Sequence, residues 1–170
     1  MERTSAADAV SYARAERTWG AVALFGRAEQ AAIVCVAMSK FKTRTEVRTE
    51  AAPAPVGPYS QAIRSGGLVF ASGQIPLDPA SGEIVKGEIE DETRQVLANL
   101  RAVLEAADSG LDRVVKATVY LTDLTLFPRV NAIYAEAFDA DPAPARVTVG
   151  VASLPLGAQV EIDAIALAGS

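Results

Sequence analysis

The order of hydrophobic periods along residues 62–167 is the strongest constraint on what this chain can fold into. Two short β-type runs in SQAIRSGGLVFASG flank Gly66-Gly67, a dipeptide typical of two-residue hairpin turns. A helical period over 91–107, an alternating run at 114–123, a second helical period over 125–138 and two more alternating runs follow. This order predicts an α+β fold, a mixed sheet with two helices packed on one face.

Each predicted helix carries a single apolar stripe. In the first helix the stripe consists of Val96, Leu97, Leu100, Val103, Leu104 and Ala107, and the opposite side carries Glu92, Asn99, Arg101 and Glu105. In the second helix it consists of Phe127, Val130, Tyr134, Ala137 and Phe138. Two helices of this kind cover only one side of a sheet, so the other side is left uncovered.

Strand alternation assigns residues to the two faces of the sheet. In VVKATVYLTD (114–123), one face carries Val115, Ala117, Val119 and Leu121, and the other carries Lys116, Thr118, Tyr120 and Thr122. In PARVTVGV (144–151), we expect the valines at 147, 149 and 151 to pack on the helices and Arg146, Thr148 and Gly150 to face away. The uncovered side, with Tyr120, Thr118, Thr148 and Gly150, is half apolar, which predicts burial against further copies of the chain.

Composition excludes several classes of protein. The 170 residues, half of them hydrophobic, suffice for one domain with a substantial core, and the net charge of −5 disfavours a broad nucleic-acid surface. There is no histidine, and Cys35 is the only cysteine. This removes Ser-His and Cys-His nucleophiles, the usual zinc sites and disulfides within the chain. Catalysis therefore depends on carboxylates, Tyr, Lys, Arg, hydroxyls or backbone groups, and a cytoplasmic setting fits.

The first 37 residues differ from the rest. They are rich in alanine, and charges interrupt their apolar stretch, which argues against a secretory signal. No run approaches the roughly 20 apolar residues of a membrane span. Met38 begins an ordinary N-terminal sequence, so we expect residues 1–37 to be an extension without a defined fold, disordered or upstream of the natural start, and residues 38–170 to be the domain. The alternative for residues 1–37 is a short amphipathic helix.

Six segments together resemble one known family. They are GPYSQAI (57–63), SGQIPLDPASGE (72–83), TRQVLANLRAVLEAA (93–107), VVKATVYLTD (114–123), PARVTVGVASLP (144–155) and VEIDAIAL (160–167). In this order and spacing the chain, over about residues 43–168, resembles the RidA/YjgF reactive-intermediate deaminase family. Any one segment alone would be weak evidence, and residues 1–37 have no part in the resemblance.

The resemblance implies a fold and an activity. Such proteins are homotrimers with a chorismate-mutase-like α+β fold, whose sheets face the centre and whose ligand clefts lie between subunits. Members with the carboxylate-binding arginine hydrolyse enamine/imine intermediates, such as 2-iminobutyrate and 2-iminopropionate, to 2-keto acids and ammonia. PLP-dependent dehydratases acting on threonine or serine supply these intermediates. The resemblance implies that no cofactor or metal is needed.

Two charged residues match the family's catalytic positions. Arg146 matches an arginine that binds the substrate carboxylate, and a planar guanidinium suits this role through two parallel hydrogen bonds. The alternative is an ion pair with a neighbouring subunit or a solvated strand end. Glu161 matches a glutamate proposed to orient the attacking water. It shares a face of VEIDAIAL with Asp163, which we take as structural, and the other face consists of Val160, Ile162, Ala164 and Ala166. The alternative for Glu161 is a solvated or inter-subunit ion-pairing acid.

Four further residues match cleft positions of the family. Tyr59 would line the cleft, or else anchor the core. Ser72 and Gly73 end a strand, where the missing side chain at Gly73 would let a small ligand approach the main chain; the alternative is simple turn chemistry. Thr148 stands where many close members have cysteine. It keeps a small hydroxyl but removes thiolate chemistry, which leaves the subgroup and the preferred imine open.

Two other functions remain open at the sequence level. One is a non-catalytic regulatory module that binds a small carboxylate in the same cleft. The other is an endoribonuclease or translation inhibitor, a role attributed to some relatives. The negative charge, the absence of histidine and the lack of a basic stripe with interleaved aromatics argue against RNA. We therefore expect a small-molecule 2-imino acid as the partner, without nucleic acid or membrane.

Overall fold

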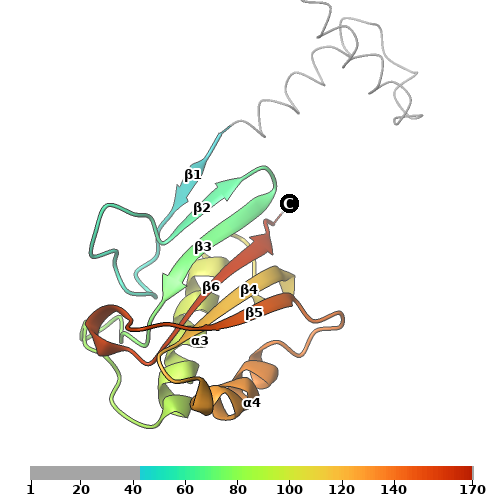
Figure 1. Ribbon diagram of the computed structural model, residues 1–170. Helices are drawn as coiled ribbons and strands as arrows, with labels where there is room; N and C mark the ends of the chain where they lie inside the picture. The colour runs from blue at the N-terminus through green and yellow to red at the C-terminus, as the bar shows by residue number, and fades with distance from the viewer. Residues whose placement is uncertain (1–42, 170) are drawn as a thin grey trace, which may run out of the picture. The chain divides into compact units, whose positions relative to one another are not determined.

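A computed structural model describes residues 43–169 (Figure 1). The strands are β1 (Thr45–Val47), β2 (Ala62–Ser65), β3 (Leu68–Gln74), β4 (Val114–Leu121), β5 (Ala145–Gly150) and β6 (Val160–Leu167). The helices are α3 (Ile89–Glu105) and α4 (Phe127–Ala137), with short 3₁₀ turns at Leu111–Arg113, Leu124–Leu126 and Pro155–Gly157. The predictions for residues 1–37 and for Met38 lie outside the described residues.

The strands form one mixed sheet in the order β1-β2-β3-β6-β4-β5. β5 pairs in parallel with β4, while the other neighbours are antiparallel. Between β2 and β3, Gly66 and Gly67 have φ values of 61° and 80°. Positive φ at both central residues is typical of a type I′ turn, which glycine adopts without strain. The predicted hairpin and mixed sheet are confirmed.

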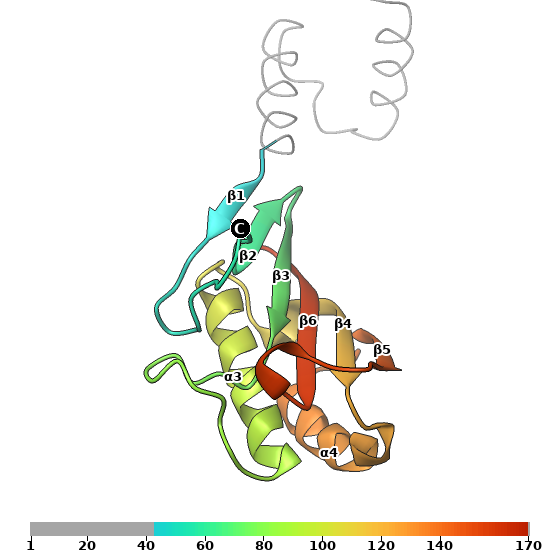
Figure 2. The ribbon, with the colours of Figure 1, turned by 60° about the vertical axis from the view of Figure 1, so that its left-hand side comes forward.

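Both helices lie against the same face of the sheet (Figures 1 and 2). This confirms the predicted α+β architecture. Arg129, in the first turn of α4, joins the starts of the two helices, because its guanidinium pairs with Glu88 at 2.7 Å and with Glu90 at 2.6 Å. Within residues 43–169, neither helix is long and apolar enough to cross a membrane.

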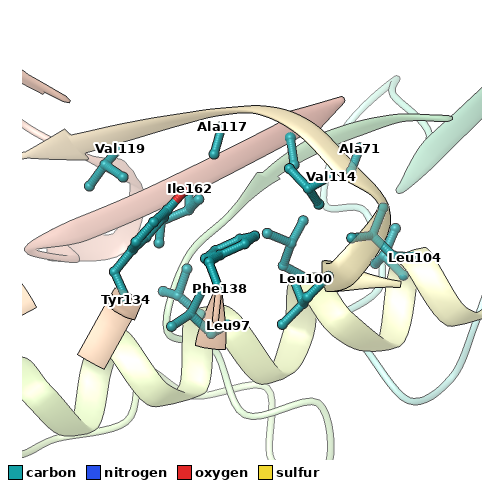
Figure 3. Close-up of a cluster of buried hydrophobic side chains, with 14 of the residues drawn as sticks. Ala71, Leu97, Leu100, Leu104, Val114, Ala117, Val119, Tyr134, Phe138 and Ile162 are labelled. Atoms are coloured by element: carbon teal, nitrogen blue, oxygen red, sulfur yellow. The ribbon is translucent and has the colours of Figure 1, made fainter. Parts of the chain in front are cut away.

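The core lies between the helices and the sheet (Figure 3). The predicted stripe of the first helix is buried throughout, and Val130, Tyr134 and Phe138 of the second stripe are buried as well. From the sheet, Ala117 and Ile162 meet these side chains, which confirms the inner faces predicted for most of β4 and for β6. Tyr134 and Phe138 stack with their ring centroids 4.3 Å apart.

Two polar residues predicted on the outer side of α3 are instead buried. Asn99 is 1% exposed, and its Nδ2 donates hydrogen bonds to the carbonyls of Ile75, at 3.1 Å, and Leu77, at 2.8 Å. Glu92 is 5% exposed, and its carboxylate accepts hydrogen bonds from the backbone and side-chain N–H groups of Gln159. Each side chain is buried because a loop distant in sequence supplies its partner, which a helical period does not reveal.

The face assignment of β5 is also corrected. The aligned pairs are Ala117 with Arg146, Thr118 with Val147, Val119 with Thr148 and Tyr120 with Val149. Because aligned residues share a face, Arg146 and Thr148 lie on the helix side with the core residues of β4. Val147 and Val149 lie on the uncovered side, where they are 48% and 40% exposed. Alternation separated the two rows correctly, but the expectation that the valines pack on the helices is wrong.

A β-bulge explains a second deviation in β4. Val115 was expected to share a face with Ala117, yet it is 41% exposed, whereas Val114 is buried. The register with β6 shifts between Val114 and Lys116. A bulge inserts one residue and so reverses the alternation on one side of it. The core therefore takes Val114 in place of Val115.

Candidate functional site

The side chain of Arg146 packs against one face of α4. Its guanidinium carbon is 4.6 Å from the ring centroid of Tyr134 and 5.5 Å from that of Phe127. Its Nη1 donates a hydrogen bond of 2.8 Å to Oδ1 of Asn131. These three helix residues occur at spacings of four and three, so they share one face of the helix. Stacking on aromatic faces and one amide hydrogen bond together restrict the orientation of the guanidinium.

The arrangement leaves Arg146 able to bind an anion. The side chain is at the exposed edge of the sheet, and among residues 43–169 it forms no ion pair. Asn131 uses one nitrogen of the guanidinium, and a planar guanidinium has five N–H donors. Burial raises the pKa of Tyr134, opposed by the charge of Arg146, so the ring beneath the guanidinium is a neutral phenol at pH 7. A carboxylate can therefore bind along the free N–H edge.

Glu161 lies on the opposite face of the sheet, at the start of β6. It is half-buried and is aligned with Tyr120 of β4. Burial raises the pKa of Glu161, and the nearby Asp163 carboxylate adds to the effect. Asp163 itself accepts a hydrogen bond of 2.8 Å from the Tyr120 hydroxyl, consistent with a structural role. A carboxylate with a raised pKa is the better proton acceptor near neutral pH.

A β-bulge at Ser72 and Gly73 lies against the Glu161 side chain. A side chain at Gly73 would overlap Oε1 of Glu161, so the carboxylate occupies the space that the glycine leaves free. We expected this space to admit a ligand, and the structure fills it with Glu161. Gln74 holds the bulge, because its buried Nε2 donates to the carbonyls of Ser72, at 3.0 Å, and Gly73, at 3.5 Å.

Tyr59 belongs to a loop beside this bulge. Its side chain is 50% exposed, which excludes the alternative of a core anchor. The backbone N–H of Val56 donates to its hydroxyl oxygen at 3.4 Å. The next residue, Ser60, accepts a hydrogen bond of 2.7 Å from Oγ of Ser72. Tyr59 is thus joined through Ser60 to the bulge that contacts Glu161.

The predicted site residues therefore form two groups. The first, on the helix side of β5, contains Arg146 and Thr148. The second, at one end of the sheet and reaching its uncovered side, contains Tyr59, Ser72, Gly73 and Glu161. Alternation places Arg146 and Glu161 on opposite faces, so a single chain does not bring the two charged groups together.

Two residues that support Arg146 were not predicted as site residues from the sequence. Tyr134 was assigned to the core without its contact to Arg146, and Asn131 was not singled out. A signal for Asn131 was present, since it is a polar residue four positions after Phe127 and three before Tyr134 in an apolar stripe. In the part of the chain that the structure describes, no cluster of three or more His, Cys, Asp or Glu side chains could hold a metal ion.

Comparison with known proteins identifies the family. The family described as endoribonuclease L-PSP matches residues 49–168. The chain belongs to this family. A RutC family protein of Pyrococcus horikoshii is 56% identical over 118 residues, which cover 69% of this chain and 93% of that protein. The chloroplastic Reactive Intermediate Deaminase A of Arabidopsis thaliana is 46% identical over 152 residues, 88% of this chain and 80% of that protein.

A solved structure supports the same assignment. E. coli TdcF with bound serine has a TM-score of 0.70 and 39% sequence identity, over 74% of this chain and 99% of that chain. The resemblance to the RidA/YjgF group is thus confirmed for this member of the L-PSP family.

The contact between Gly73 and Glu161 leads to a structural prediction. In Gly73→Ala, the new methyl group would overlap the Glu161 carboxylate, which is the free end of a flexible side chain. We expect the carboxylate to rotate away, with a loss in the free energy of unfolding below about 1.5 kcal/mol. A crystal structure and urea denaturation would measure both. In the control Gly57→Ala, the new methyl group would lie 3.5 Å from Tyr59, an ordinary contact. A Glu161 carboxylate unmoved in Gly73→Ala would contradict the packing described.

Proposed function

We propose that this L-PSP family protein hydrolyses 2-imino acids and their enamine forms, such as 2-iminobutyrate and 2-iminopropionate, to 2-keto acids and ammonia. The observation that carries the proposal is Arg146, an exposed guanidinium oriented by Tyr134 and Asn131 and without an ion pair among the described residues. The 46% identity between this chain and the Arabidopsis thaliana Reactive Intermediate Deaminase A supports the same class of reaction, the deamination of reactive intermediates. The setting we propose is the cytoplasm, downstream of PLP-dependent dehydratases.

Arg146 would bind the substrate carboxylate. A carboxylate matches the guanidinium through two parallel N–H···O hydrogen bonds, which fix the plane of the substrate as well as its position. The related TdcF binds serine, a small molecule that also carries a carboxylate. Thr148, on the same side of β5, adds a small hydroxyl beside the arginine.

Glu161 would activate the water. Water adds to the carbon of the protonated imine as one of its protons passes to the Glu161 carboxylate, which forms a neutral carbinolamine. Glu161 then gives this proton to the amino nitrogen. As the C–N bond breaks and ammonia leaves, the carbinolamine hydroxyl gives its proton back to the Glu161 carboxylate, which forms the 2-keto acid and releases the proton to solvent. Positioning accounts for much of such a rate enhancement, and proton transfer adds about 10²–10⁴-fold. No step requires a metal or a cofactor.

We further propose that the cleft forms between copies of the chain in a homotrimer whose sheets face the centre. Two observations support this. Arg146 and Glu161 lie on opposite faces of one sheet, so both reach one substrate only if different copies supply them. The uncovered face also exposes apolar side chains, among them Phe70 at 43% and Leu167 at 47%, and such a face is typical of an interface.

RNA cleavage is the second candidate, because the family's description names an endoribonuclease. The net charge of −5 and the absence of histidine weigh against it. RNA cleavage that persists after repurification and disappears in a site variant would favour this function. A regulatory module that only binds carboxylates would bind 2-ketobutyrate without accelerating the loss of imine.

Replacement of Arg146 tests the proposed hydrolysis. We expect Arg146→Ala to lower kcat/KM by at least about a hundredfold, because the substrate loses its orientation. Arg146→Lys should recover little, since an ammonium lacks the planar pair of donors. A threonine dehydratase would generate the imine, and semicarbazide would trap what remains. Arg101→Ala, a change at an exposed arginine of α3, is the control. Wild-type activity in Arg146→Ala would refute the assignment.

The pH dependence of kcat tests Glu161. At saturating substrate the carboxylate of the bound substrate neutralises the charge of Arg146. The loss of kcat at low pH, the acid limb of the profile, is then governed by the protonation of Glu161, whose pKa is raised. A base must be ionised, so we expect kcat to fall as the pH falls through a value above 4.5, the ordinary pKa of the group. Glu161→Gln should lower kcat about a hundredfold and remove this limb. An unchanged acid limb in Glu161→Gln would assign the titration to another group.

Complementation tests whether the site is shared between copies. Arg146→Ala and Glu161→Gln each remove one half of the proposed cleft. In oligomers formed by co-expression of the two variants, about a quarter of the clefts would combine an intact Arg146 with an intact Glu161. Activity in the mixture above either pure variant is the expected result. Activity no higher than that of the pure variants would place both residues in a cleft formed by one chain.

A further inference from the structure

Gln61 is a buried hydrogen-bonding centre that the proposed mechanism does not use. Its side chain is 3% exposed and lies directly before β2. Its Nε2 donates to the carbonyls of Thr49, at 3.0 Å, Ala52, at 3.2 Å, and Pro53, at 2.9 Å. Its Oε1 accepts a hydrogen bond of 2.8 Å from the backbone N–H of Thr49. One carboxamide thus binds the backbone of a whole turn at both its donor and its acceptor end.

The same residue connects to the candidate site. Its backbone carbonyl accepts a hydrogen bond of 3.0 Å from the N–H of Ser72, and the preceding Ser60 accepts one from Oγ of Ser72. Tyr59 is two positions before Gln61 in the chain. The side chain of Gln61 therefore holds one end of the loop that carries Tyr59, and its backbone holds the other end beside the bulge.

The loop between these anchors has little regular structure of its own. Residues 49–60 contain Pro53, Pro55 and Pro58, which lack a backbone N–H, and no strand or helix. Within the loop the N–H of Tyr59 donates to the carbonyl of Gly57, at 2.8 Å. Val56 is 81% exposed, so apolar burial holds its tip weakly. The carboxamide of Gln61 replaces the ladder of hydrogen bonds that a strand would supply.

We propose that Gln61 is a positioning residue for substrate binding, whose buried carboxamide holds residues 49–60 so that Tyr59 lies at the cleft, next to the hydrogen bond between Ser60 and Ser72. This inference rests on the proposed hydrolysis of 2-imino acids. Gln61 touches neither the substrate nor the reacting atoms, and it acts through Tyr59. It should therefore influence the binding of the substrate more than the chemical step.

The test replaces Gln61 with methionine, which has a similar length but no hydrogen-bonding amide. Three carbonyls and the Thr49 N–H would lose their partner, so the loop should loosen. We expect KM to rise about fivefold, the factor that corresponds to the loss of one hydrogen bond between neutral groups, while kcat stays nearly unchanged. Hydrogen–deuterium exchange should become faster for the amides of residues 49–60, above all for Thr49, but not for α3 or β6.

Two controls separate positioning from a general loss of stability. Gln95→Met removes the same group from α3, where Nε2 donates to Oδ1 of Asn99 at 2.9 Å, and should leave KM and loop exchange unchanged. In a Tyr59→Ala background, Gln61→Met should raise KM little further, because its effect passes through Tyr59. In an Arg146→Lys background its effect on KM should persist in full.

These measurements decide whether Gln61 positions Tyr59 for substrate binding. A raised KM with an intact kcat, together with faster exchange confined to the loop, would support the proposal. Loop exchange unchanged in Gln61→Met, or a KM effect that persists in full in the Tyr59→Ala background, would overturn it. If the wild type hydrolyses no imine, the proposed function fails. The exchange experiment, with KM replaced by the dissociation constant of 2-ketobutyrate, then still tests Gln61.

Discussion

Burial of only one face of the sheet determines where each candidate site residue can lie. Side chains alternate along a strand, so the neighbour of a core residue on either side must face away from the helices. Glu161 stands between Val160 and Ile162, both fully buried. It therefore lies on the uncovered face for the same reason that β6 packs on α3 and α4. The position of the proposed catalytic carboxylate is a consequence of core packing, and it changes only if the register of β6 changes.

Arg146 obeys the same rule but is at the edge of the sheet. Arg146 is aligned with the core residue Ala117 of β4 and shares its face of the sheet. On a central strand, this position would require an apolar side chain. At an edge strand the side chain reaches solvent while its guanidinium lies over the rings of Phe127 and Tyr134 of α4. An inward-pointing charge also discourages pairing of the free strand edge with other chains. One residue can thus protect the edge and bind an anion.

Sequence reasoning predicted the architecture because it depends on local periods. The stripes of both helices, the Gly66-Gly67 hairpin and the faces of β6 all follow from spacing within one element. It failed where a second element decides. On β5, alternation separated Arg146 from the valines, but which row meets the helices depends on pairing with β4. Glu92 is buried because Gln159, 67 positions later, supplies its hydrogen bonds. The site residues came from the family resemblance, and no local pattern indicated that they form two groups on opposite faces.

Buried polar side chains hold the irregular parts of the molecule at the site. In the described part of the chain five polar side chains are buried, and four of them bind loops or bulges: Gln61, Gln74, Glu92 and Asn99. Each of these side chains binds backbone groups. Replacement of one by an apolar residue of similar size would leave buried carbonyls or N–H groups without a partner, which lowers the free energy of unfolding by about 1–3 kcal/mol for each group. Gln74 holds the bulge beneath Glu161, and Glu92 holds the residue two positions before Glu161. The geometry at this end of the sheet therefore depends on side-chain hydrogen bonds to the backbone, whereas the opposite end depends on the two-residue turn at Gly66 and Gly67.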